Sequence, residues 1–167
     1  MAVDNNTTLP HDEAIDRIWE LADKIDFCMF TTWNGEQQAS RPMSARVNRD
    51  ENAIYFLTSD DSHKIEELAK FPNVSLGFAD NANHSYVVIA GKADVSNDRA
   101  KIKELWNAFD KAFWDSEDDP NIRLVTVTPE DAELWDGPNG LIAGAKMLFA
   151  VASGAKPDMG DNAKVSM

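Results

Sequence analysis

The spacing of apolar residues predicts one amphipathic helix followed by a series of short strands. From Pro10 to Ile25, apolar residues recur at helical intervals, with acidic residues in the first turn and Lys24 near the end. Further helices are expected at 62–70, 98–109 and 141–152. Strands are expected at 27–33, 38–47, 53–58, 74–79, 85–95, 122–128 and 132–135. Residues 153–167 follow neither period, so a loose C-terminal tail is expected there.

Three residues or pairs that break regular structure refine this prediction. Asn34-Gly35 separates the first two strands and is a strong hairpin signal, since a type I′ turn needs positive φ at both central positions. Pro42 lies inside the second strand and cannot donate to a sheet, which predicts an edge strand or a bulge. Gly91 predicts a bulge or a close backbone contact in the fifth strand.

The order of these elements favours an antiparallel sheet. Strands joined by hairpins outnumber helices, and strand and helix do not alternate as in a doubly wound fold. The sequence therefore predicts a mainly β protein with flanking helices (α+β), most economically closed as a barrel. We expect a single domain over residues 1–152, followed by the tail at 153–167.

Charge and cysteine content exclude several classes of protein. The 167 residues carry a formal net charge of −13, which argues against binding to nucleic acid or to an anionic membrane surface. The single cysteine, Cys28, allows no intramolecular disulfide and is expected to be a buried, inert thiol. The N-terminus shows no secretory signal, and no apolar run reaches about 20 residues. A cytoplasmic protein is expected.

Common catalytic and metal-binding patterns are missing from the sequence. It contains no GxxxxGK[ST], GxGxxG, HExxH or GxSxG motif. Its three histidines, His11, His63 and His84, stand far apart without ligand spacing, so no metal site is expected.

The segment from Thr58 to Lys64 is the first candidate for binding chemistry. It places Ser62, His63 and Lys64 at the start of a predicted helix, where free N–H groups and the helix dipole favour an anion. Cations in that first turn are unfavourable unless an anion binds there. A phosphate monoester fits this pattern. An ordinary capped helix that binds nothing explains the same residues equally well.

Two further residues extend this candidate site. Arg41 stands beside Pro42, and its guanidinium could grip phosphate oxygens in a bidentate way, although a solvated edge charge is the simpler interpretation. The gap that Pro42 leaves in the sheet could let a flat ligand meet the strand at Met43 and Ser44. Trp135 could wall a ring system, but tryptophan more commonly packs in a core.

These residues together resemble the pyridoxamine 5′-phosphate oxidase superfamily, and within it the general stress protein branch. The likeness runs from the first helix to about Leu148, and its strength lies in the order and spacing of the pieces. The pieces are Ser40-Arg41-Pro42-Met43, Tyr55-Phe56-Leu57-Thr58, Ser62-His63-Lys64, Gly91-Lys92-Ala93, Leu105-Trp106, Asp118-Asp119-Pro120 and Glu133-Leu134-Trp135-Asp136.

The resemblance implies a split β-barrel that binds FMN, or possibly FAD, at the interface of a homodimer. Arg41, Ser62 and Lys64 would hold the FMN phosphate, with His63 as a basic neighbour. Met43, Ser44 and Thr58 would border the flavin ring and ribityl chain, and Trp135 would approach the flavin from the partner subunit. The implied function is that of a stress protein and flavin-dependent oxidoreductase. A non-catalytic flavin store or sensor is the alternative, and a deazaflavin or haem protein is a weaker one.

Departures from the oxidase pattern argue against true pyridoxamine phosphate oxidase activity. The oxidases follow their tryptophan with an Arg-x-His pair that grips the substrate phosphate, but residues 136–142 contain neither residue type. Tyr86 stands close to the position of an oxidase glutamine near the flavin ring. A phosphorylated vitamer would therefore lack its counter-charge.

A group of aromatic residues in the second half of the chain independently suggests self-association. Trp106, Phe109, Phe113 and Trp114 are more than a small monomer usually leaves in water, although they could simply cover the barrel.

Overall fold

The computed structural model describes residues 9–137, 148, 151–154 and 160–167. Its helices are α1 (His11–Ile25), α2 (His63–Lys70) and α3 (Arg99–Leu105), with a 3₁₀ turn η1 (Asp110–Ala112). Its strands are β1 (Phe27–Trp33), β2 (Gln38–Ser44), β3 (Arg46–Asn48), β4 (Ala53–Ser59), β5 (Asn73–Asp80), β6 (Ser85–Ser96), β7 (Ile122–Asp136) and β8 (Asp161–Ser166).

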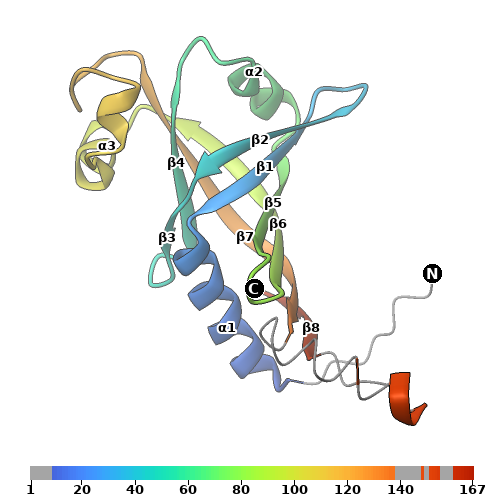
Figure 1. Ribbon diagram of the computed structural model, residues 1–167. Coiled ribbons are helices and arrows are strands. Elements are labelled where there is room, and N and C mark those ends of the chain that lie inside the picture. The colour runs from blue at the N-terminus through green and yellow to red at the C-terminus, as the bar shows by residue number, and fades with distance from the viewer. Residues whose placement is uncertain (1–8, 138–147, 149–150, 155–159) are drawn as a thin grey trace.

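The strands form one antiparallel sheet that curls into a half-barrel (Figure 1). The strand order is β2-β1-β5-β6-β7-β4-β3, and β8 also pairs with β7. The two edge strands of this order, β2 and β3, are consecutive in the chain and separated only by Ala45. The sheet edges are thus held together at Ala45 and part beyond it, which confirms the expected split barrel with flanking helices.

Helices cover the sheet on two sides. The main core is formed by α1, which buries Ala14, Ile18 and Leu21 against the strands. A second, smaller core lies between α3 and the other face of β4 and β7, around Ile102. Strand β4 is buried from Ala53 to Thr58 because both of its faces pack against these cores. Its end, which carries Thr58 and Ser59, is therefore rigidly placed.

The C-terminal half of the chain corrects two predictions. The strands expected at 122–128 and 132–135 are one long strand, β7, because a register shift at Ala90 and Gly91 of β6 lets the pairing run on past Pro129. Residues 161–166 form β8 instead of part of a loose tail. This strand buries Ala163 and Val165 in the main core and pairs with the later part of β7, beyond the part that pairs with β4.

Most predictions made from single glycine and proline residues agree with the structure. Gly91 lies at the register shift, as predicted, and Pro42 lies on the edge strand β2. The hairpin at Asn34-Gly35 exists, but only Gly35 has positive φ, so the turn is not type I′. Instead the loop has four residues, and the Asn34 side chain accepts hydrogen bonds from the backbone of Glu36 and Gln37.

The described residues cover three of the four predicted helices. The helices expected from Pro10 and from Ser62 are present as α1 and α2. The helix expected at 98–109 ends at Leu105 and is followed by η1. The helix expected at 141–152 falls mostly outside the described residues. Among the described residues, no helix has the length and apolar character that crossing a membrane requires.

Candidate functional site

A pocket of about 320 Å³ opens where the two sheet edges part. The later half of β4 pairs with β7 but not with β3, which reaches only as far as Tyr55. Strand β2 faces this gap from the other edge and carries Pro42 there. The pocket is completed by Lys64 of α2 and by the segment around η1. Its volume lies at the lower end of the range for small-molecule sites.

Lys64 forms the cationic floor of this pocket. Its side chain is largely buried, with 9% of the residue exposed, and its Nζ donates to Thr58 Oγ1 at 2.5 Å and to Ser62 Oγ at 2.8 Å. Within the described part of the chain, no carboxylate lies in ion-pair distance of this amine. Burial and the nearby charge of Arg41 lower the pKa of Lys64. The more distant charges of Glu67 and Asp61 offset only part of that shift. An anion would therefore relieve the cost of this buried charge.

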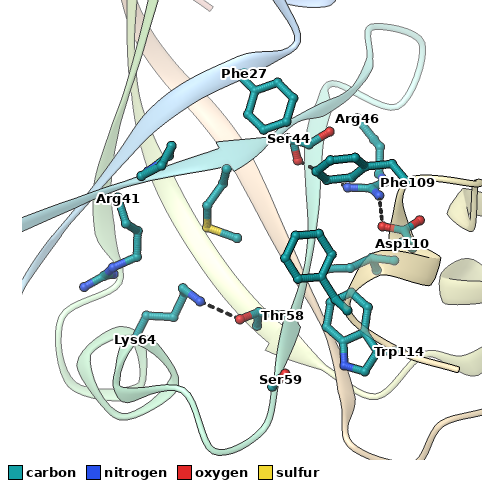
Figure 2. Close-up of a pocket in the computed structure, with 14 residues that line it drawn as sticks. Phe27, Arg41, Ser44, Arg46, Thr58, Ser59, Lys64, Phe109, Asp110 and Trp114 are labelled. Carbon is teal, nitrogen blue, oxygen red and sulfur yellow. Dashed lines mark hydrogen bonds and ion pairs between the residues drawn. The ribbon is translucent and has the colours of Figure 1, made fainter.

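Arg41 stands beside Lys64 in a polar network. Its guanidinium donates to Thr32 Oγ1 at 3.0 Å and to Glu67 Oε2 at 3.2 Å, and Thr32 donates to the same carboxylate. Although burial raises the pKa of Glu67, the hydrogen bonds from Thr32 and Arg41 lower that pKa overall. Glu67 thus remains ionised and orients Arg41. Figure 2 shows Arg41 and Lys64 on the same side of the pocket.

Aromatic rings form the opposite side of the pocket (Figure 2). Phe27 and Phe109 meet edge to face, with centroids 5.5 Å apart, and the ring series continues through Phe113 to Trp114. Phe113 is 63% exposed. We call these four residues (Phe27, Phe109, Phe113 and Trp114) the aromatic wall. A flat apolar ligand would find a partner there.

A largely buried ion pair lies beside the aromatic wall, and both of its residues also line the pocket. The Arg46 guanidinium donates to Asp110 Oδ1, and the Asp110 side chain is only 3% exposed. Arg46 also donates to the Ser44 carbonyl at 3.2 Å and so links the wall segment to the end of β2. Asp110 Oδ2 in turn accepts the backbone N–H of Asn107 at 2.9 Å.

The pocket brings together most of the residues predicted from sequence. Arg41, Met43, Ser44, Thr58 and Lys64 all line it.

The other three candidates, Ser62, His63 and Trp135, are placed differently. Ser62 makes no side-chain cap for α2. Its hydroxyl accepts a hydrogen bond from Lys64, and Ser62 itself does not line the pocket. His63 is exposed in the first turn of α2 and does not line the pocket. Trp135 lies far along β7, next to Tyr86 and β8, and is likewise absent from the lining.

Sequence reasoning missed the residues that support this site. Glu67 follows Lys64 by three positions on α2, a spacing that could have suggested a shared face. The pairing of Arg46 with Asp110 joins segments far apart in sequence and leaves no local signal. In the sequence, Phe109, Phe113 and Trp114 suggest only an association surface, and Phe27 gives no signal of its place in the wall. Cys28 is buried as expected, and burial raises the pKa of its thiol to about 12. The described residues hold no cluster suited to a metal ion.

Comparison with known proteins identifies relatives. The sequence profile described as "Pyridoxamine 5'-phosphate oxidase like" matches residues 13–158. General stress protein 26 of Bacillus subtilis (strain 168) is 35% identical over 108 residues, covering 59% of this chain and 74% of that protein.

Solved structures agree in fold. A general stress protein 26 from Jannaschia sp. CCS1 superposes with a TM-score of 0.78 at 23% identity, covering 95% of this chain and 100% of that one. The general stress FMN/FAD binding protein from Xanthomonas citri gives a TM-score of 0.67 at 25% identity, covering 75% and 89%. Since the family profile spans most of the sequence and the half-barrel matches, this chain belongs to the pyridoxamine 5′-phosphate oxidase-like family and is similar to its general stress proteins.

Proposed function

We propose that this protein binds FMN in the pocket between β2 and β4 and acts as a flavin-dependent oxidoreductase. The observation that carries the proposal is the pairing of a buried Lys64 with Arg41 on one side of a pocket whose other side is aromatic. The two cations suit a dianionic phosphate, and the hydroxyl of Thr58 suits a polar chain. A neighbour in the same family is described as an FMN/FAD binding protein.

In this assignment the residues of the chain bind and orient, and the flavin supplies the redox chemistry. Arg41 and Lys64 would hold the phosphate, with Ser62 supporting Lys64 and His63 adding positive charge nearby. Met43, Ser44 and Thr58 would border the rest of the cofactor. The oxidase Arg-x-His pair is missing from residues 136–142, so pyridoxamine phosphate oxidation is not proposed.

The proposal includes a homodimer. The outer face of the sheet exposes several apolar side chains: Met29, Val88 and Trp135 are 46%, 38% and 40% exposed. Strand pairing aligns Met29, Gly77 and Val88 in one row across β1, β5 and β6, with Tyr86 and Trp135 in a nearby row. The first row continues on β7 and β8 into the Glu133–Lys164 ion pair, which borders this apolar patch. An apolar patch with a charged border suits a second copy of the chain. In that dimer, Trp135 would reach the partner subunit's pocket.

Binding measurements with FMN and riboflavin test the phosphate assignment. Lys64→Ala should weaken FMN by about 1.5–3 kcal/mol, the value of a hydrogen bond to a charged group, while riboflavin binding stays unchanged. Lys70→Ala, which removes an exposed lysine from the other end of α2, is the matched control and should alter neither ligand. Purified protein that takes up no added FMN, or a Lys64 variant that loses both ligands equally, would contradict the assignment.

A flavin store without turnover is the second candidate function. It is favoured by the titratable residues that line the pocket, which are three bases held as cations and one carboxylate already paired with Arg46. Lys64, whose pKa is lowered, is assigned to the phosphate, and the other three leave no evident group for proton transfer. Anaerobic mixing of the FMN-loaded protein with NADH or NADPH discriminates the two functions. Bleaching of the flavin band supports the oxidoreductase, and an unchanged band with both donors supports the store.

A further inference from the structure

The segment that carries most of the aromatic wall is held by Asn107, whose side chain accepts the backbone N–H of Phe109 at 2.8 Å, and by Asp110, which bonds at both ends. The Asp110 side chain accepts the backbone N–H of Asn107, and its backbone carbonyl accepts those of Phe113 at 2.9 Å and Trp114 at 3.1 Å. The same residue is thus bonded on both sides of the turn that presents Phe109 and Phe113. The α3 helix has already ended at Leu105, so no regular helix holds this segment in place.

Arg46 fixes this segment against the sheet. It is the first residue of β3, directly after the point where the two sheet edges meet, and its side chain reaches Asp110, the Leu105 carbonyl at 3.4 Å and the Ser44 carbonyl at 3.2 Å. Each contact is to a group that lines the pocket or borders the wall segment. A buried ion pair of this kind is costly to break, because removing one partner leaves the other charge unpaired.

Rings of the aromatic wall remain exposed to solvent. Phe109 and Phe113 are 45% and 63% exposed, and both line the pocket on the side opposite Arg41 and Lys64. A largely buried ion pair therefore holds rings that are not themselves buried. A ligand with a flat ring system would supply the missing contact.

We infer that Asp110, held by Arg46, is a positioning residue that sets the aromatic wall to receive the ring system of the ligand, separately from the phosphate site at Arg41 and Lys64. The inference rests on the proposed flavin binding and deepens it. It divides the pocket into two halves with different chemistry. One half recognises a dianion and the other a planar ring, so the two contributions to affinity should be separable by mutation.

Three probes separate these halves: riboflavin for the ring, inorganic phosphate for the cationic side, and FMN for both. Asp110→Asn should weaken riboflavin and FMN by the same factor, at least tenfold, while phosphate binding followed by phosphorus NMR stays unchanged. Lys64→Ala should show the opposite pattern, with riboflavin unchanged and phosphate weakened. A general folding defect would instead reduce all three, which overturns the positioning role of Asp110.

A second variant keeps the test independent of the buried pair. Phe113→Ala removes an exposed ring that belongs to neither core and should weaken riboflavin at least fivefold without affecting phosphate. Trp33→Ala is its control, since Trp33 is 40% exposed at the end of β1 and does not line the pocket.

The outcomes distinguish this inference from the proposed function. If the unmodified protein binds neither flavin, the proposed function fails and the inference fails with it. If the unmodified protein binds riboflavin, and Asp110→Asn and Phe113→Ala bind it equally well, the inference alone fails.

Discussion

At the scale of single residues, the pocket depends on a lysine kept in an unfavourable place. Lys64 is buried beside Arg41, and both burial and that neighbouring charge lower its pKa. The unfolded chain restores the ordinary lysine pKa and so binds the proton more tightly. Lys64 therefore lowers the free energy of unfolding at neutral pH. This loss disappears as the pH rises from the lowered pKa of the folded protein to the ordinary lysine pKa of the unfolded chain. A bound dianion would favour the charged form.

This electrostatic arrangement predicts a pH-dependent affinity. Between about pH 7 and the ordinary lysine value of about 10.4, FMN affinity should fall as Lys64 loses its proton, while the phosphate stays dianionic. Riboflavin affinity should not follow this curve. Lys64→Arg should remove the decline, because arginine keeps its charge throughout the range. Fluorescence titrations across the range measure this, and an identical decline in the arginine variant would show that another group titrates.

At the scale of elements, the bulge between β6 and β7 decides how the half-barrel is built. The register shift at Gly91 lets β7 pair with β4 along its first part and with β8 along its last part. Gly91 is needed there because a β-carbon would collide with the Thr128 carbonyl and lie 3.1 Å from Val127 Cγ1. The close approach of two backbones, not a special φ angle, is the constraint.

A pair of glycine variants tests this constraint. Gly91→Ala should lower the free energy of unfolding by about 1–3 kcal/mol, as expected for an overpacked site whose neighbour is rigid backbone. Gly77→Ala in β5 should be close to neutral, because nothing lies within 4 Å of the added carbon. Urea unfolding curves give both values. Equal losses in the two variants would mean that the contact with Thr128 does not control the effect, since strand propensity alone favours alanine over glycine.

At the scale of the whole molecule, one arrangement would explain both the exposed apolar side chains of the sheet and the distance of Trp135 from the pocket. One chain leaves Met29, Val88 and Trp135 partly exposed and forms the pocket without Trp135. Both features are explained if two copies pack through this face. A net charge of −13 opposes such an association at long range, so the apolar side chains of this face would have to supply the attraction.

A charge placed on this face should separate the subunits. Val88→Glu should convert a dimer into a monomer in sedimentation velocity, because the carboxylate would be buried at the contact beside Glu133, whose charge is already paired with Lys164. FMN affinity should fall with it if Trp135 of the partner subunit contributes to the site. Gln37→Glu adds the same charge in the exposed β1–β2 loop and should leave both properties unchanged. A monomeric unmodified protein would contradict the dimer.

The site could be predicted only in part from the sequence. Arg41, Met43, Ser44, Thr58 and Lys64 come from short segments whose order is informative, and the structure places all five on one pocket. Asp110 and Arg46 could not be paired in advance, since nothing near either residue reveals the other. Residues 161–166 lack a strong pattern of their own because β8 is stabilised by pairing with β7 and by burying two small side chains.

The sequence by itself determined the helices α1 and α2, most of the strands, the edge position of Pro42 and the irregularity at Gly91, because each depends on local periodicity or backbone chemistry. Only the tertiary structure decided where the sheet edges part, that Arg41 is oriented by Glu67, and that Asp110 anchors the aromatic wall. These features join residues distant along the chain, and their energies arise from burial and charge pairing that exist only after folding.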